Sequence, residues 1–284
     1  MIETRGLTFR YGAANEPAVR ELSFEVGRGE IFGFLGPSGS GKSTTQKILI
    51  GLLAGYQGEV RVLEKDRAQW VPDDYERIGV SFETPNHFNK LSGLENLRYF
   101  GALYQRPTRD PHAVLAALGL LGDADTPVGE WSKGMRVRLS MARCLLHDPD
   151  LLFLDEPTAG LDPVNAERVK DLIEAERAAG RTVFLTTHDM TVADELCDRV
   201  AFLVDGHIAS IDSPRALKLQ HGERSVRVEF REGESVGRRE FPLDGIGRNG
   251  AFHALLAGSE VETIHSREAS LADVFIAVTG KALS

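Results

Sequence analysis

The chain has 284 residues, a formal net charge of −9 and 42% hydrophobic residues, proportions that are ordinary for a globular protein. This acidity, without a concentrated basic block, argues against broad nucleic-acid binding, and no apolar run approaches the roughly 18 residues that cross a bilayer. Two cysteines, Cys144 and Cys197, form neither a disulfide framework nor a paired metal motif, so the chain suits a reducing compartment.

Short apolar runs alternate with glycine turns in the first part of the chain. The run EIFGFL is nearly all apolar and stops at Gly36, as a buried central strand does. A helical spacing of apolar residues follows over 44–53. We expect strands over 7–11, 21–26, 30–35, 59–63 and 78–82.

Strand signals disappear over 85–146, where apolar residues recur at helical spacing. Two buried parallel strands are expected over 151–154 and 182–186, with a helix over 164–179 between them. Asp205-Gly206 is a favoured tight-turn pair and predicts a hairpin over 200–211. The sequence therefore predicts an α/β core, residues 1–214, that carries a helical insertion at about 85–146.

A different pattern begins after residue 214. Apolar residues alternate with charged ones over 226–230, which predicts a strand with one face in water. A helix over 251–256, a strand over 261–264 and a final helix over 271–278 are expected to follow. Residues 215–284 are therefore predicted to form a small α+β domain.

Residues 36–43 read GPSGSGKS and lie between an expected strand and an expected helix, the required context of the G-x-x-x-x-G-K-[ST] pattern. Gly36, Gly39 and Gly41 let the backbone bend so that its N–H groups point at phosphate oxygens. Lys42 can reach the β- and γ-phosphates, and the Ser43 hydroxyl can bind Mg²⁺. A flexible glycine turn would match only by chance, so we interpret this segment as a nucleoside triphosphate site.

Two carboxylates end the expected strand LLFLDE at 151–156. Ligands bind at the carboxyl ends of parallel strands, so Asp155 is placed to hold Mg²⁺ and Glu156 to orient and polarise an attacking water. The next strand ends at TTH, which brings His188 to the same edge, within reach of the γ-phosphate. Adjacent acids also occur as solvated turn residues and a lone histidine as a helix cap, but the order of the three motifs favours the functional interpretation.

This order of motifs resembles the nucleotide-binding subunit of an ATP-binding cassette (ABC) transporter, over about residues 2–214. The resemblance implies a P-loop NTPase core of ABC type, with an antiparallel β subdomain and a helical subdomain, that binds and hydrolyses ATP with Mg²⁺. It implies catalytic roles for Lys42, Glu156 and His188. The matching motifs are GPSGSGKST (36–44), similar to Walker A; LLFLDEP (151–157), similar to Walker B with its catalytic glutamate; AGLD (159–162), similar to the D-loop; and TTHDM (186–190), similar to the switch histidine.

The resemblance also implies which residues contact the nucleotide. Tyr11, in FRYG, lies where the family places an aromatic ring that stacks on adenine, and Asp162 belongs to the D-loop. The phosphate loop would contribute Gly36, Pro37, Ser38, Gly39, Ser40, Gly41, Lys42, Ser43 and Thr44.

The family's signature motif, usually LSGGQ, is WSKGM at 131–135 in this chain. Ser132 and Gly134 match the family pattern, and the other three positions do not. By resemblance, Ser132 and the Gly134 amide would contact the γ-phosphate held by the other subunit, at the start of a helix whose dipole faces that phosphate. Lys133 lies between them and adds a positive charge, so we assign it to the nucleotide site as well. Ser132 could also be an N-cap, which is compatible with this contact, and Lys133 could favour closure over ATP or point into solvent.

Glu83, in IGVSFETPNHF (78–88), occupies a loop position where the family usually carries glutamine. A glutamate lacks the amide donor and adds negative charge near the phosphates. We assign Glu83 to Mg²⁺ binding together with Ser43 and Asp155.

Two further stretches, FETPNHFNKLSGLENL (82–97) and ASLADVFIAVTG (269–280), are similar to the exporter branch often called ABC-2 type. The resemblance implies that two cassettes, identical or merely related, close head to tail over two MgATP. It also implies that residues from Pro85 to Tyr104 contact a separate transmembrane permease, with the subunit on the cytoplasmic face of the membrane.

Three alternatives stay open at this stage. A soluble ABC ATPase that acts on nucleic acid or ribosomes is disfavoured by the single Walker A motif, the absence of a long heptad run and the negative charge. A weakly catalytic nucleotide sensor is disfavoured by the intact Asp155, Glu156 and His188. A simple phosphotransferase would leave the other motifs unexplained.

Overall fold

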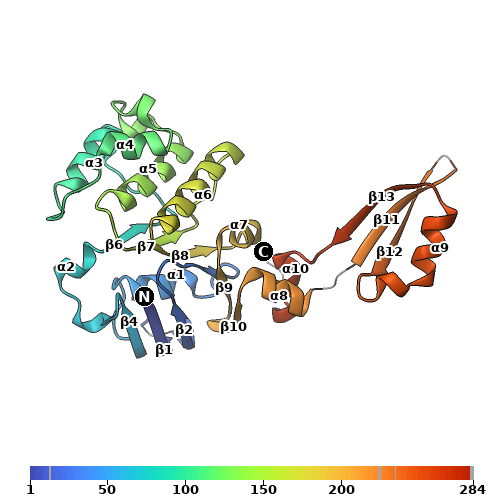
Figure 1. The fold of residues 1–284 in the computed structure, drawn as a ribbon. Coiled ribbons are helices and arrows are strands. Elements are labelled where there is room, and N and C mark those ends of the chain that lie inside the picture. Colours follow the sequence, from blue (N-terminus) through green and yellow to red (C-terminus); the bar gives the residue numbers. More distant parts are fainter. Residues whose placement is uncertain (13, 223–224, 234, 282–284) are drawn as a thin grey trace. The chain divides into compact units, whose positions relative to one another are not determined.

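The computed structural model describes residues 1–12, 14–222, 225–233 and 235–281. The chain divides into two compact units, Met1–Ser213 and a second unit that begins at Pro214. The elements of both units are labelled in Figure 1.

A six-stranded sheet of order β10-β9-β3-β8-β7-β6 forms the centre of the first unit. The strands from β6 to β9 in this sheet run parallel, and β10 pairs antiparallel with β9 in the expected hairpin. The parallel register sets Leu35 beside Thr187 and Asp155 beside Thr186, so the ends of β3, β7 and β8 share one edge. The strands are β3 (Ile31–Leu35), β6 (Ile78–Ser81), β7 (Leu151–Asp155), β8 (Thr182–Thr187), β9 (Arg199–Val204) and β10 (His207–Asp212).

A second sheet, of order β2-β1-β4-β5, is antiparallel throughout. Phe24 of this sheet stacks on Phe32 of the central sheet, with ring centroids 5.7 Å apart, so the two sheets share one core. The first strand begins earlier than the expected 7–11, because Gly6 (φ 61°) and a register shift interrupt the alternation that marks a strand. The strands are β1 (Ile2–Phe9), β2 (Val19–Val26), β4 (Gln57–Val62) and β5 (Lys65–Asp66).

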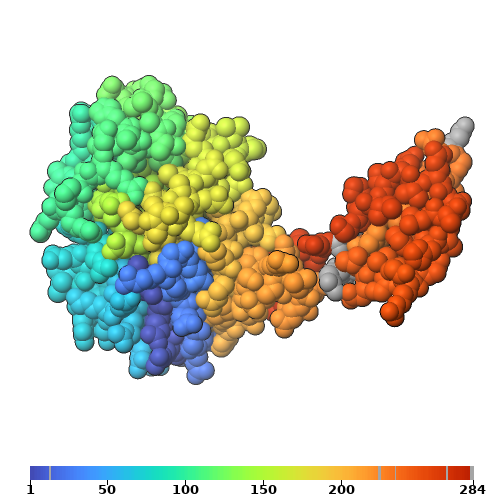
Figure 2. Space-filling view, viewed as in Figure 1, coloured from blue at the N-terminus to red at the C-terminus, as the bar shows by residue number. Residues whose placement is uncertain are grey.

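Helices cover the central sheet and form the predicted helical subdomain. Figure 1 shows α3, α4 and α5 on the side of the central sheet opposite β1, β2 and β4, and Figure 2 shows their atoms, in green, gathered at one end of the first unit. The helices are α1 (Lys42–Leu49), α2 (Pro72–Tyr75), α3 (Gly93–Gly101), α4 (Pro111–Ala117), α5 (Lys133–Leu145), α6 (Pro163–Ala178) and α7 (Met190–Leu196), with short 3₁₀ turns η1 (Arg67–Gln69), η2 (Leu121–Asp123) and η3 (Val128–Glu130).

Helix α1 is shorter than the predicted helix over 44–53. Gly51 follows it in the left-handed region, at φ 79°, and a Cβ at this position would lie 1.2 Å from Nη2 of Arg67. The Arg67 guanidinium instead donates to the Ile50 carbonyl at 3.1 Å and so closes the helix end.

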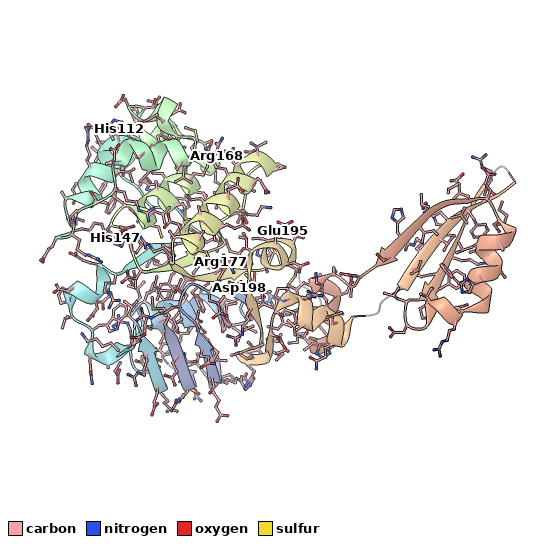
Figure 3. The ribbon with its side chains drawn as sticks, in the orientation of Figure 1. His112, His147, Arg168, Arg177, Glu195 and Asp198 are labelled. Carbon is pink, nitrogen blue, oxygen red and sulfur yellow. The ribbon has the colours of Figure 1, made fainter. Side chains whose placement is uncertain are left out.

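An ion pair fixes α6 to the central sheet. The Arg177 guanidinium of α6 lies 2.6 Å from Asp198, the residue before β9 (Figure 3), and the other oxygen of Asp198 accepts from the backbone N–H of Ile31 at 2.9 Å. Helix α6 begins directly after the segment 159–162. The ion pair therefore holds in place the helix that follows this segment.

The second unit contains a three-stranded antiparallel sheet of order β12-β11-β13, with α9 packed on one face. β11 buries Val226, Val228 and Phe230 and exposes the alternate residues to a greater extent, as predicted. β12 was not predicted, because its sequence SVGRREFP has no apolar alternation and it lies mostly exposed. The elements are α8 (Pro214–His221), β11 (Ser225–Glu232), β12 (Ser235–Pro242), η4 (Ile246–Arg248), α9 (Gly250–Gly258), β13 (Val261–Arg267) and α10 (Leu271–Thr279).

Within the described ranges, the structure contains no helix with the length and apolar character that a membrane span requires.

Candidate nucleotide site

The loop between β3 and α1 has the backbone that a phosphate site needs. Gly39 and Gly41 adopt φ angles of 79° and 110°, a region that L-residues with side chains rarely adopt. A Cβ at Gly36 would lie 2.1 Å from the carbonyl oxygen of Leu203, so only glycine permits this close approach to β9. The N-terminus of α1 follows directly at Lys42 and leaves its first N–H groups without partners inside the helix.

The Lys42 side chain is folded back into this loop and is buried. Its ammonium donates to the carbonyl oxygens of Gly36 at 2.6 Å and Pro37 at 3.1 Å. Burial lowers the pKa of Lys42, while the negative charges of Glu156 and Asp155 raise it in opposition. Phosphate oxygens can replace the two carbonyls as partners of the ammonium, since they offer a charged acceptor in the same loop.

The side chains around the loop differ in their access to solvent. The Tyr11 hydroxyl lies 3.1 Å from Oγ1 of Thr44, and Tyr11 is 42% exposed, so part of the residue is accessible to a ligand. Ser43 is exposed at the start of α1. Ser40 is buried, and its hydroxyl has no hydrogen-bond partner among the residues that the structure describes.

Asp155 lies at the end of β7, beside the phosphate loop. Its Oδ1 accepts a hydrogen bond from the Thr186 hydroxyl of β8. Burial raises the pKa of Asp155 against the effect of that hydrogen bond, and the nearby charges of Glu156 and Glu83 raise it further. A cation at this position would offset the repulsion among the three carboxylates.

Glu156 follows in the left-handed region, at φ 49°, a strained conformation for glutamate that its N–H stabilises by donating to the Thr186 carbonyl at 2.9 Å. The carboxylate accepts from the Thr187 hydroxyl at 2.9 Å and from the backbone N–H of His188 at 2.9 Å. Nδ1 of His188 lies 2.7 Å from the same carboxylate. The structure thus brings Glu156, which was assigned to the attacking water, into contact with His188, which was assigned to the γ-phosphate.

Glu83 is exposed on the loop after β6, and its charge acts on both Lys42 and Asp155. Among the described residues, no group of three or more His, Cys, Asp or Glu side chains could hold a metal ion by itself. Ser43, Asp155 and Glu83 offer the oxygen ligands that Mg²⁺ prefers, and few protein ligands suffice when phosphate and water complete the coordination. The residues present therefore fit a magnesium ion that binds together with a nucleotide.

The segment 132–134 and the segment 159–162 form a second group. The hydroxyl of Ser132 accepts from the Met135 N–H at 3.2 Å, so Ser132 is the N-cap of the 13-residue helix α5. A Cβ at Gly160 would lie 3.4 Å from the Lys133 ammonium, and one at Gly134 would lie 3.3 Å from Leu161, so the two segments adjoin.

Asp162, the last residue of the second group, is the N-cap of α6. It accepts from the N–H and the side-chain amide of Asn165, at 3.1 and 2.6 Å, and these hydrogen bonds lower the pKa of Asp162. The residue that was assigned to the nucleotide is therefore also a structural cap.

Sequence analysis did not assign several residues that the structure places around Asp155 and Glu156. The hydroxyls of Thr186 and Thr187 donate to the two carboxylates, and Oε1 of the buried Gln46 lies 3.4 Å from the Thr186 hydroxyl. For Thr186 and Thr187, the sequence signal that could have identified them is their position directly before His188. The sequence gives no such signal for Gln46, because it lies inside an ordinary helical stretch.

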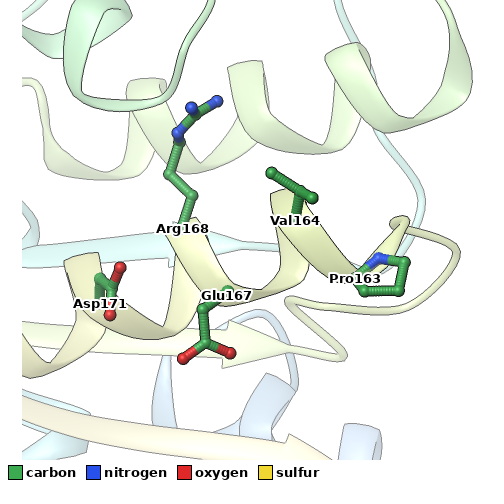
Figure 4. Close-up of a pocket in the computed structure, with 5 residues that line it drawn as sticks. All are labelled: Pro163, Val164, Glu167, Arg168 and Asp171. Carbon is green, nitrogen blue, oxygen red and sulfur yellow. The ribbon is translucent and has the colours of Figure 1, made fainter.

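A pocket elsewhere on the first unit contains none of the residues predicted to bind nucleotide. It lies on the first turns of α6 and begins at Pro163, directly after Asp162 (Figure 4). Its lining residues are Pro163, Val164, Glu167, Arg168 and Asp171.

Comparison with known proteins places the chain among transporter subunits. The family described as "ABC transporter" matches residues 19–159, and the family "Fluoroquinolone efflux ABC transporter C-terminal domain" matches residues 224–268. Fluoroquinolones export ATP-binding proteins of Mycobacterium tuberculosis (strains CDC 1551 / Oshkosh and ATCC 25618 / H37Rv) are 61% identical over all of this chain and 95% of their own length. Nod factor export ATP-binding protein I of Rhizobium meliloti (strain 1021) is 38% identical over 76% of this chain and 65% of its own length.

Solved structures agree with the predicted fold. An ATP-binding subunit of an ABC transporter superposes with a TM-score of 0.70 at 25% identity, over 78% of this chain and 92% of its own. A dimeric ATP-binding cassette in a post-hydrolysis state, bound to ADP and phosphate, superposes with a TM-score of 0.68 at 26% identity, over 75% of this chain and 98% of its own. These relatives favour export over an action on nucleic acid. The chain therefore belongs to the ABC transporter family, as the ATP-binding and ATP-hydrolysing subunit of an exporter.

Proposed function

We propose that this subunit holds MgATP between its own phosphate loop and residues 132–134 of a second cassette, and that hydrolysis reopens the pair. The observation that carries this proposal is the arrangement of Lys42, Asp155 and Glu156, which meet at one edge of the central sheet. Ser132 heads a different element, helix α5, whose N-terminus suits a phosphate. Each chain supplies both kinds of surface, so another copy of this chain can complete the site.

The residues at the sheet edge divide the chemistry between them. Lys42 exchanges its bonds to the Gly36 and Pro37 carbonyls for bonds to the β- and γ-phosphates. Glu156 accepts a proton from the attacking water, and His188, whose side chain is 65% exposed, donates to the γ-phosphate. Ser43, Asp155 and Glu83 would hold Mg²⁺, which when bound neutralises charge that develops on the phosphate oxygens.

Mixing two inactive variants tests whether the site is shared between chains. Lys42→Ala disables the phosphate loop, which is one half of the shared site. Ser132→Arg blocks the signature segment, which is the other half. A mixed dimer retains one site in which both halves are wild type, so ATPase activity should return on mixing although each variant alone is inactive. Mixed dimers that form normally but show no recovery of phosphate release would contradict the proposal.

We further propose that the helical subdomain contacts the permease through an aromatic surface of Phe88, Tyr99 and Phe100. Phe88 and Tyr99 are 45% and 49% exposed, with ring centroids 4.8 Å apart, and Phe100 lies 5.7 Å from Phe88. The buried Asn96 supports this surface, because its amide accepts from and donates to the backbone of Phe88 at 3.0 and 3.1 Å. Exposed aromatic rings on a rigid support are typical of binding surfaces.

Co-purification tests the permease surface. Phe88→Glu combined with Tyr99→Glu should abolish recovery of the permease with the tagged subunit from detergent extracts, while ATP affinity stays unchanged. Val164→Glu, a change at another exposed apolar residue of the first unit, is the matched control. Full recovery of the permease with the double variant would rule out this surface.

The substrate class follows from the relatives alone. We propose that the complete exporter, with this subunit on the cytoplasmic face of the membrane, removes fluoroquinolones, because the 61% identical relatives carry that name and the second unit matches the corresponding C-terminal family. Cells that express the subunit with its permease should accumulate less fluoroquinolone than cells with the Glu156→Gln subunit. Equal accumulation, with the complex present in the membrane, would exclude this substrate class.

A further inference from the structure

Two segments that are far apart in the sequence are joined just before the signature helix. Residues 127–131 lead into Ser132, and residues 89–93 lead into α3, which carries the aromatic surface. Ser92 and Pro127 also pair as an isolated antiparallel bridge. The backbone hydrogen bonds between the segments are Gly129 N to Asn89 O and Val128 N to Leu91 O, each 2.9 Å.

A side-chain contact completes this junction. Trp131 is only 2% exposed, and its ring lies over Gly93, the first residue of α3. A Cβ at Gly93 would lie 2.4 Å from Cη2 and 2.6 Å from Cζ2 of the ring. The indole therefore packs directly on the α3 backbone, and only glycine leaves room for it. Trp131 lies where the family usually has leucine. Its ring is larger than a leucine side chain, and the absence of a side chain at Gly93 leaves room for it.

The other end of the loop is also attached to α5. Nε2 of His87 lies 2.9 Å from the carbonyl oxygen of Arg136, in the first turn of α5, and Arg143 donates to the Asn86 carbonyl at 2.9 Å. One end of the loop before α3 is thus tied to α5, and the other end is tied to residues 128–131, which lead into α5. A displacement of this loop must move Ser132, unless the contacts break.

We propose that Trp131 is a positioning residue, whose packing on Gly93 sets Ser132 relative to α3 and the aromatic surface. The inference rests on the proposed function, since Ser132 must meet the nucleotide of the other cassette for its position to matter. Trp131 acts on closure of the two cassettes over ATP and not on nucleotide binding to a single subunit, because ADP in the phosphate loop does not need residues 132–134.

Gly93→Ala tests the contact with one methyl group. Gly93 is not at a positive φ, and alanine is a better helix former than glycine, so the substitution itself does not disfavour α3. The full-length chain carries Glu156→Gln as a background that retains ATP, and ATP-driven dimerisation is measured by sedimentation. We expect at least a tenfold higher ATP concentration at half-dimerisation, with ADP affinity unchanged.

Gly122→Ala is the matched control, because this glycine lies in the same subdomain, has no positive φ and has no neighbour within 4 Å of the added Cβ. It should leave ATP-driven dimerisation unchanged. Trp131→Leu should weaken dimerisation alone, and combined with Gly93→Ala it should recover part of the loss, since the smaller side chain makes room for the methyl group. Recovery distinguishes positioning from a general loss of stability.

Ser132→Arg in the same background separates the inference from the proposed function. If Ser132→Arg abolishes dimerisation while Gly93→Ala and Trp131→Leu leave it unchanged, Trp131 has no positioning role and the proposed function stands. If Ser132→Arg also leaves dimerisation unchanged, the shared site is wrong and the inference fails with it. A parallel loss of ADP affinity in Gly93→Ala would equally overturn the inference.

Discussion

The phosphate loop and the signature segment, the two segments that we propose to bind phosphate, are held in place by different means. In the phosphate loop the main chain sets the geometry, since Gly39 and Gly41 adopt left-handed φ angles and the loop cannot accept a side chain at Gly36. In the signature segment a helix cap at Ser132 and the packing of Trp131 on Gly93 set it.

This difference predicts which of the two segments tolerates amino-acid substitutions. Main-chain geometry needs particular residues at particular positions, and the loop accordingly matches its pattern at every constrained position. A helix N-terminus needs only a cap and a neighbour of the right shape, and the signature accordingly departs from LSGGQ at three of five positions. In the function that we propose, the sheet edge supplies the chemistry and the signature segment supplies assembly.

The largest expected effect is on the turnover rate, from a substitution at the edge of the central sheet. Glu156→Gln should reduce turnover by about 10²- to 10⁴-fold, because the amide cannot accept the proton of the attacking water. ATP binding should persist. Phosphate release and nucleotide binding measured on the same sample check both statements, and Glu167→Gln, an exposed carboxylate on α6, is the control. Near-normal turnover would remove Glu156 from the role of base.

Lys42→Ala should weaken ATP binding by roughly 10- to 100-fold, since a hydrogen bond to a charged group contributes about 1.5–3 kcal/mol. Equilibrium titration with ATP measures the change. Lys47→Ala, an exposed lysine on the same helix, removes the same charge without touching the phosphate loop. An unchanged dissociation constant for Lys42→Ala would count against the phosphate assignment.

Ser132→Ala probes the signature side and should have a smaller effect. Loss of the N-cap should lower the free energy of unfolding by about 1 kcal/mol, and ATP-driven dimerisation should weaken because a phosphate partner is lost. Ser270→Ala removes the corresponding cap of α10 in the second unit. Ser270→Ala should lower the free energy of unfolding to a similar extent and leave ATP-driven dimerisation unchanged. If both variants dimerise equally well, Ser132 is only a helix cap and does not contact the nucleotide.

Glu83→Gln should produce the smallest change. The amide keeps an oxygen ligand but loses a negative charge, so half-maximal ATP binding should require several-fold more Mg²⁺. Removal of this charge should also lower the pKa of Asp155, which Glu83 now raises. A magnesium titration of ATP binding measures the requirement, and an unchanged curve would mean that Glu83 does not bind the ion.

The sequence by itself determined the phosphate loop, the acidic strand end and the order of the motifs, because these are local patterns in which spacing fixes the chemistry. It also predicted the buried strands β3, β7 and β8, whose continuous apolar runs have few alternatives. It missed β12, where polar residues fill an exposed edge strand, and misplaced β1, where a glycine interrupts the alternation.

Only the tertiary structure decided how distant residues meet. The bond between Glu156 and His188 depends on the parallel register of β7 and β8, and the packing of Trp131 on Gly93 joins residues 38 positions apart. No spacing along the chain encodes such contacts, because they arise when separate elements pack against each other. The departure at Trp131 therefore had a physical reason that the sequence did not show, because the ring lies where α3 has no side chain at Gly93.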